Sequence, residues 1–276
     1  MHNAADFRRR LLARELLIGT YLKTPSPVIA EVMGLSGLDV VCLDAEHAPF
    51  DRVSLDACVH ALRSANTPVV IRMEDNTPVQ VMQALDYGAY GVIAAHVNTV
   101  EAAQKLVHSA YFGPGGRGYA GSTRAAGYTT VPISEHVARS QASTSVIAQI
   151  EDLSALDVLD GIAAVEGLDC LFVGRVDLTV DSGATQVQDA RVMEAVAQIC
   201  RAGQRAGKAV GMFLPRMEEL PHWIELGASF FLMESDHSLM LKGANKLRAD
   251  FAKAASPVTK VVTKSGAPPK TGGDTT

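Results

Sequence analysis

The sequence predicts a single (β/α)8 barrel, the TIM-barrel fold, preceded by one extra helix. The length of 276 residues is ordinary for one α/β barrel with a large core. Short apolar runs alternate with helical segments of about ten residues, which is typical of βαβ units and a parallel sheet. Eight apolar runs occur, and eight strands close such a barrel.

The expected elements follow in order along the chain. Phe7, Leu11, Leu12 and Leu16 have helical spacing, so an amphipathic helix is expected over residues 1–16. Each expected strand is a short run rich in Val, Ile or Leu, as buried parallel strands are. The strands are 17–21, 40–43, 69–73, 91–97, 146–150, 170–173, 209–213 and 230–233, and the helices between them are 25–35, 52–64, 78–87, 100–109, 133–141, 154–162, 190–205 and 217–226.

The last helix is expected over 237–254, so the barrel domain is predicted to span 1–254. Residues 255–276 contain SPVTKVVTKSGAPPKTGGDTT, which is rich in Pro, Gly, Thr and Lys. Few large apolar side chains are available there to bury, so this segment is predicted to be a disordered tail.

Composition limits the classes of function. Net charge is 25 minus 30, or −5, with no basic run, which argues against nucleic-acid binding. No apolar segment reaches the roughly 18 residues of a membrane span, and the N-terminus lacks the apolar stretch of a signal peptide. Four dispersed cysteines without a CxxC pair are typical of a reducing compartment, so a cytoplasmic protein is expected.

The stretch GLDVVCLDAEHAPF organises the prediction of function. The apolar run 40–43 stops at Asp44, Glu46 and His47, three ionisable side chains that the core of a strand would not tolerate. Residues at the carboxyl ends of barrel strands line the catalytic face, so these three are predicted to lie at the barrel mouth. The alternative is that they are only solvated loop residues.

Polar residues end other strands as well, among them Arg72, Gln149, Glu151, Arg175, Asp177, Glu234 and Asp236. Glu151 and Asp177 end neighbouring strands, whose backbones are roughly 5 Å apart. Two such carboxylates suit a divalent cation with oxygen ligands, such as Mg²⁺ or Mn²⁺. Alternatively, one of them pairs with Arg175 or caps a helix.

His47 and Arg72 also end adjacent strands. A neutral imidazole is the usual general base at pH 7, and an Arg fork suits a carboxylate or a developing enolate oxygen. Among the other histidines only His96, near the end of a strand, is kept as a candidate.

The Gly-rich segment 111–128 has no secondary-structure period. So long a segment in a compact domain is usually functional or mobile. Gly115, Gly116 and Gly118 could offer N–H groups to an anion, but the segment lacks the Lys and Ser/Thr of a phosphate loop. It is predicted to be a mouth or subunit-contact loop in which Arg117 or Arg124 meets a substrate carboxylate.

The sequence resembles the HpcH/HpaI class II 2-oxo-acid aldolases over residues 7–250. Six segments carry this resemblance by their order and spacing: LDAEHAP, VVIRM, LDYGAYG, GGRG, AQIED and VGRVDL. The resemblance implies a barrel that depends on Mg²⁺, Mn²⁺ or Co²⁺ and assembles as a hexamer, a trimer of dimers. The implied roles are metal binding by Glu151 and Asp177, enolate stabilisation by Arg72, base catalysis by His47 oriented by Asp44 or Asp86, and substrate contact by Gln149 and Gly174. One departure from the family pattern is Arg175, where relatives commonly have Pro. The added positive charge is expected to affect substrate preference.

The chemistry that this resemblance implies is cleavage of 4-hydroxy-2-oxo acids to pyruvate, or an analogue, and an aldehyde. A Schiff-base aldolase would need a lysine at a strand end in an apolar pocket, and only Lys23 comes near. The remaining alternatives are a citrate-lyase-like CoA-ester lyase or condensing enzyme, and a catalytically idle barrel that acts as a scaffold.

Overall fold

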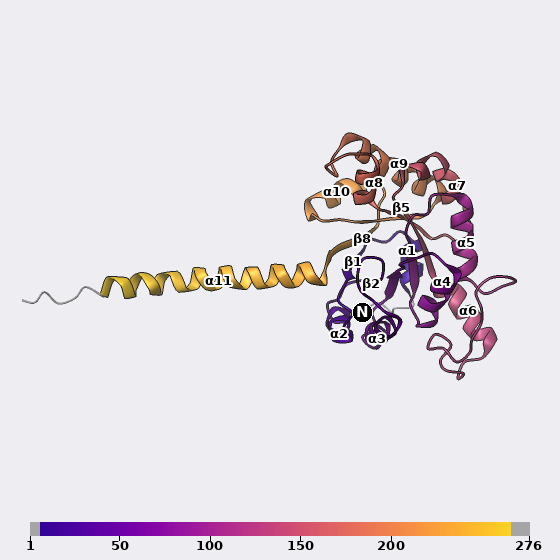
Figure 1. Ribbon diagram of the computed structural model, residues 1–276, viewed down its shortest axis with the longest axis horizontal. Helices are drawn as coiled ribbons and strands as arrows, with labels where there is room; N and C mark the ends of the chain where they lie inside the picture. The colour runs from indigo at the N-terminus through magenta and orange to yellow at the C-terminus, as the bar shows by residue number, and fades with distance from the viewer. Residues whose placement is uncertain (1–5, 266–276) are drawn as a thin grey trace, which may run out of the picture. The chain divides into compact units, whose positions relative to one another are not determined.

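The computed structural model describes residues 6–265, with side chains for residues 6–255. The chain divides into two compact units, the first ending at Asp236 and the second beginning at His237. In the first unit, eight parallel strands close into a barrel in chain order, which confirms the predicted (β/α)8 fold (Figure 1). The strands are β1 (Leu17–Leu22), β2 (Val40–Asp44), β3 (Val69–Arg72), β4 (Gly91–Ala94), β5 (Ser145–Ile150), β6 (Cys170–Val173), β7 (Ala209–Phe213) and β8 (Phe230–Ser235).

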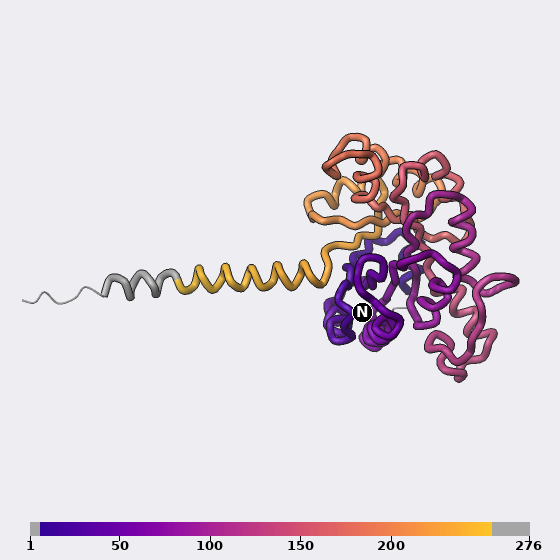
Figure 2. Tube along the Cα trace, in the orientation of Figure 1, coloured from indigo at the N-terminus to yellow at the C-terminus, as the bar shows by residue number. Residues whose placement is uncertain are grey.

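Helices follow the strands around the barrel, and the trace of the first unit shows this alternation (Figure 2). They are α1 (Phe7–Leu12), α2 (Pro27–Gly34), α3 (Arg52–Ser64), α4 (Pro78–Asp86), α5 (Val100–Ala110), α6 (Ile133–Ser143), η2 (Leu153–Val158), α7 (Leu159–Ala163), α8 (Arg175–Asp181), α9 (Ala190–Ala206), η3 (Met217–Glu219) and α10 (Leu220–Glu225). The helix α11 (Asp236–Ser265) follows β8. Among the described residues, no helix has both the length and the apolar character needed to cross a membrane.

Several predicted elements need correction, including the strand predicted over 91–97, which ends at Ala94. The first helix spans Phe7–Leu12, so it ends before the predicted residue 16, and Leu16 is exposed rather than part of a buried face; residues 1–5 of the predicted helix lie outside the described residues. The short helix α8 was not predicted, because its seven residues contain too little periodic signal. The last helix continues past Ala254 to Ser265, and the rest of the predicted tail, 266–276, lies outside the described residues.

Alternate residues of each strand fill the inside of the barrel. Val40, Val70, Ile147, Phe172 and Phe230 belong to one buried inner cluster. Their neighbours in sequence face the surrounding helices and form a second buried cluster, as the two-residue period of a strand requires.

The helix α1 packs against the amino ends of the strands. Phe7 is buried against Phe230 at the start of β8, with ring centroids 5.9 Å apart and an edge-to-face orientation. Arg8 binds Asp169, which immediately precedes β6, through Nε and Nη2 at 3.0 Å each. The opposite end of the barrel, where the strands finish, therefore holds the polar residues that the sequence placed at the mouth.

The same alternation turns those polar side chains into the barrel. Asp44 and Arg72 each stand two residues after an inward-facing apolar residue, and they are direct partners in the β2–β3 register. Gln149 and Glu151 follow the inward-facing Ile147 in the same way. Strand period and register thus bring residues that are distant in sequence to one mouth.

Candidate active site

Arg72 is the centre of an ion-pair network at the ends of β2 and β3. Its Nη2 lies 2.8 Å and its Nε 3.0 Å from Asp44 Oδ1, while Nε lies 3.2 Å from Glu46 Oε2. The guanidinium carbon lies 4.6 Å from the centre of the Tyr21 ring, which adds a cation–π contact. Because the side chain is only 9% exposed and held from three sides, its fork is preorganised for an anionic oxygen.

Asp44 is fully buried and remains ionised. Burial alone would raise the pKa of this carboxyl group, but the charges of Arg72 and Lys23 hold the pKa below its ordinary value. Lys23 Nζ lies 2.5 Å from Asp44 Oδ2. Asp44 therefore acts as a fixed anion between two cations rather than as a group that exchanges protons.

Glu151 is the buried acid that follows β5, and it is 2% exposed. Its Oε2 accepts a hydrogen bond from Gln149 Nε2 at 2.5 Å, and its Oε1 accepts one from the backbone N–H of His96 at 2.8 Å. Burial raises the pKa of Glu151; these hydrogen bonds oppose the shift, and the negative charge of Asp177 adds to it. A cation beside Glu151 would relieve this unfavourable burial.

Gly174 follows β6 and leaves the space that Glu151 occupies. A Cβ atom at Gly174 would lie 2.4 Å from Glu151 Cβ and 2.5 Å from its Oε2. Gly174 therefore makes room for the buried acid, and its predicted contact with substrate stays a prediction.

Gly174→Ala is expected to displace Glu151, to destabilise the protein by about 1–3 kcal/mol and to weaken divalent-metal binding. Chemical denaturation and titration calorimetry with Mn²⁺ measure the two effects. Gly113→Ala is the control, because nothing lies within 4 Å of an added Cβ there. Unchanged stability and metal affinity in Gly174→Ala would contradict this role.

A candidate metal site is formed by Glu46, His96 and Glu151, which each offer one ligand atom within 4.8 Å of the others. Glu46 Oε2 is buried and makes no hydrogen bond, although it is ion-paired with Arg72. A buried acid with a raised pKa and a buried carboxylate oxygen without a donor suit a divalent cation. The donor set of this mouth therefore fits a metal ion.

Asp177, the other predicted metal ligand, lies in the first turn of α8 and is partly exposed. Its charge acts on Glu151, so the two acids are neighbours, but Asp177 is not a member of the Glu46–His96–Glu151 group. A carboxylate in the first turn of a helix also interacts favourably with the helix dipole. Metal binding by Asp177 stays a prediction.

His47, the predicted base, lies at the mouth with 59% of its side chain exposed. Its Nε2 is 3.9 Å from Glu46 Oε2, and its backbone N–H donates to Asp44 Oδ1 at 3.2 Å. Asp44 thus positions the backbone of His47 rather than its ring.

Asp86, Arg117 and Arg124 lie away from this mouth within one chain. Asp86 is the last residue of α4, and a helix that returns along the barrel ends near the amino ends of the strands. Arg117 is buried and bound to Asp86 at 2.5 Å, while Arg124 is bound to Asp56 at 2.8 Å. The predicted mouth position of the Gly-rich segment is therefore corrected for this chain, and its role as a subunit contact stays a prediction.

Arg175 is held by two residues that follow β7. Its Nη1 lies 2.6 Å from Glu219 Oε2, and its guanidinium carbon lies 5.6 Å from the centre of the Trp223 ring. The side chain is 5% exposed, so its charge is matched within the outer layer. A role of Arg175 in substrate binding or preference stays a prediction.

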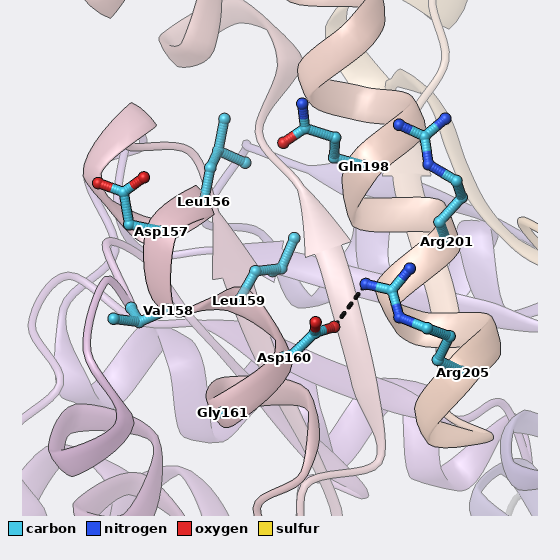
Figure 3. Close-up of a pocket in the computed structure, with 9 residues that line it drawn as sticks. All are labelled: Leu156, Asp157, Val158, Leu159, Asp160, Gly161, Gln198, Arg201 and Arg205. Carbon is cyan, nitrogen blue, oxygen red and sulfur yellow. Dashed lines mark hydrogen bonds and ion pairs between the residues drawn. The ribbon is translucent and has the colours of Figure 1, made fainter.

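A separate pocket of about 200 Å³ lies in the outer helical layer (Figure 3). Asp160 and Arg205 form an ion pair of 2.5 Å across it, from α7 and α9 respectively. Its other lining residues are Leu156, Asp157, Val158, Leu159, Gly161, Gln198 and Arg201, and none of them is a predicted site residue.

Sequence reasoning gave too little weight to three mouth residues. Lys23 was considered only as a Schiff-base lysine, Glu46 received no role, and His96 was only a reserve candidate. The two-residue period of β1 could have identified Lys23, because Tyr21 faces inward and Lys23 is the next position of the same parity.

Comparison with known proteins agrees with this fold. The model of the family described as HpcH/HpaI aldolase/citrate lyase matches residues 17–242. A 5-keto-4-deoxy-D-glucarate aldolase of Klebsiella pneumoniae is 33% identical over 249 residues, which cover 90% of this chain and 96% of that protein.

Two solved structures show the same likeness. An HpcH/HpaI aldolase/citrate lyase family protein from Burkholderia cenocepacia has a TM-score of 0.84 and 30% identity, covering 90% of this chain and 99% of that one. The citrate synthase SbnG has a TM-score of 0.80 and 25% identity, covering 90% and 98%.

Proposed function

The chain belongs to the HpcH/HpaI aldolase/citrate lyase family, and on this premise we propose that it is a metal-dependent aldolase. The reaction is reversible cleavage of a 4-hydroxy-2-oxo acid into pyruvate, or a pyruvate analogue, and an aldehyde. The observation that carries the proposal is the buried Arg72 fork, which shares one mouth with Glu151.

Arg72 provides the anion-binding part of this mechanism. Carbon–carbon cleavage leaves negative charge on the 2-oxo oxygen, and a guanidinium fixed by Asp44 and Glu46 stabilises that charge without reorganisation. Glu151 and Asp177 would hold the metal, which supplies Lewis acidity to the 2-oxo group when bound. Gln149, which donates to Glu151, positions that acid.

His47 provides the proton-transfer part. As the bond between C3 and C4 breaks, the imidazole takes the proton of the C4 hydroxyl group, and the aldehyde forms. The carbanion at C3 then accepts a proton to give pyruvate. Since Asp86 lies away from the mouth of its own barrel, it could orient His47 only from a second copy, within the proposed hexamer of three dimers. The proposed metal is Mg²⁺, Mn²⁺ or Co²⁺. The proposed location of the protein is the cytoplasm.

One other function has a specific observation in its favour. The likeness to the citrate synthase SbnG favours a condensing enzyme that joins a 2-oxo acid to an acyl group. Pyruvate release across a panel of 4-hydroxy-2-oxo acids tests the aldolase, and condensation with acetyl-CoA tests the alternative. Activity in the second assay alone would overturn the aldolase proposal, and inactivity in both would favour an idle scaffold.

Excess EDTA is expected to abolish pyruvate release, because the buried carboxylates at the mouth then lack their counter-cation. Added Mg²⁺, Mn²⁺ or Co²⁺ should restore activity, whereas a sample dialysed without EDTA serves as the control. Pyruvate with borohydride should not inactivate the enzyme, because Lys23 Nζ is bound to Asp44 rather than placed in an apolar pocket. Full activity in EDTA would contradict the metal-dependent mechanism.

A further inference from the structure

His96 has a backbone conformation that directs it toward Glu151. It follows β4 with a φ of +54°, in the left-handed region that residues other than glycine rarely adopt. In a continued strand His96 would face away from the barrel axis, because Ile93 faces inward. The left-handed turn instead lets its backbone N–H donate to Glu151 Oε1 at 2.8 Å. Unfavourable backbone conformations of this kind concentrate at functional sites.

The ring of His96 lies among carboxylate oxygens. Its Nδ1 is 3.5 Å from Glu151 Oε1 and 3.2 Å from Asp152 Oδ1. Asp152 is itself held by Asn98, whose Nδ2 donates to Asp152 Oδ2 at 3.2 Å. A metal ion bound to Nδ1 in place of a proton would therefore lie close to the carboxylates of Glu151 and Asp152.

Glu46, which follows β2, completes the group. The ligand atoms of Glu46, His96 and Glu151 all lie within 4.8 Å of one another. Metal–ligand bonds of about 2.0–2.4 Å place opposite ligand atoms about 4–5 Å apart, so one ion can reach all three. The buried Glu46 Oε2, which makes no hydrogen bond, is a second feature that a cation would satisfy.

We propose that His96 is a metal ligand, which together with Glu46 adds a nitrogen and an oxygen donor to the site that Glu151 and Asp177 would hold. The inference rests on the proposed metal-dependent function and adds a metal preference to it. Imidazole suits transition metals such as Fe²⁺, Ni²⁺ and Zn²⁺, and Co²⁺ lies between Fe²⁺ and Ni²⁺ in the affinity order of divalent metals, whereas Mg²⁺ prefers carboxylate, carbonyl and water oxygens. The site therefore binds Co²⁺ more tightly than Mg²⁺.

Titration calorimetry of the full chain with CoCl₂ or MgCl₂, without substrate, tests the inference. His96→Asn removes the imidazole, and Asn tolerates the left-handed conformation. Its Co²⁺ affinity is expected to fall at least about tenfold, a scale known for residues that support metal ligands, with a smaller change for Mg²⁺. The visible absorption of bound Co²⁺ should also shift. His60→Ala, which removes an exposed imidazole from α3, should leave both readouts unchanged.

Unchanged Co²⁺ affinity and absorption in His96→Asn would overturn His96 as a ligand and leave the proposed metal-dependent function standing. Equal binding of Co²⁺ and Mg²⁺ by the wild-type chain would overturn the metal preference. Failure of the wild-type chain to bind either metal would instead overturn the metal-dependent function itself. If His96→Asn does not fold, His96→Gly provides the same test, because glycine adopts positive φ readily.

Discussion

His47→Ala is expected to reduce aldol cleavage about 10²–10⁴-fold, the usual contribution of a general acid or base. The side chain is 59% exposed and the backbone N–H that binds Asp44 remains, so stability should change by less than about 0.5 kcal/mol. Initial rates of pyruvate release and thermal unfolding measure the two quantities. His60→Ala, on the exposed face of α3, is the matched control.

A partial reaction separates base catalysis from simple positioning. Decarboxylation of oxaloacetate requires no deprotonation of a hydroxyl group, so His47→Ala should retain it measurably while aldol cleavage falls. A parallel loss of both reactions, with unchanged metal content and circular dichroism, would show that His47 positions substrate or metal-bound water. If neither reaction fell, the stretch around His47 would have no chemical role.

Arg72→Lys is expected to lower kcat for aldol cleavage about a hundredfold or more, equivalent to about 2.7 kcal/mol of transition-state stabilisation. Lysine keeps the positive charge beside Asp44 but cannot donate two hydrogen bonds to Asp44 Oδ1 or stack its planar group on Tyr21. The charge that remains should preserve the fold, because removing one partner of a buried ion pair entirely costs about 3–5 kcal/mol.

Steady-state kinetics and chemical denaturation of Arg72→Lys test this expectation. Arg191→Lys is the control, since Arg191 is 64% exposed and paired only on the surface with Asp189. Near wild-type kcat in Arg72→Lys would remove Arg72 from the mechanism. A collapse of stability with normal kinetics per folded molecule would make the Arg72–Asp44 pair structural rather than catalytic.

The mouth combines two halves that the chain supplies separately. The first strands provide an ion-pair half, in which Arg72 and Lys23 are matched by Asp44 and Glu46. The later strands provide an anionic half centred on Glu151, whose pKa is raised mainly by burial. A divalent cation would complement the Glu151 half, and the fixed guanidinium of Arg72 would meet the oxo oxygen of a 2-oxo acid beside it.

The sequence by itself determined the barrel and much of its mouth. The alternation of apolar runs with amphipathic segments predicts alternating strands and helices. The closed barrel of eight parallel strands in chain order confirms that prediction. The position of Asp44 and Arg72 was predictable because each follows an apolar strand at the carboxyl end. The carboxyl end of a strand and the alternation of its side chains between two faces are local properties, so they can be predicted from a single sequence.

Only the tertiary structure decided which charged side chains form ion pairs with one another. Arg175 is bound by Glu219, 44 residues further along the chain, and Arg117 is bound by Asp86, 31 residues before it. The turn at His96 depends in the same way on Glu151, which follows the next strand, 55 residues further along the chain. A buried ionisable group takes whichever partner the packed chain brings within hydrogen-bond distance, and no local period of the sequence encodes that distance.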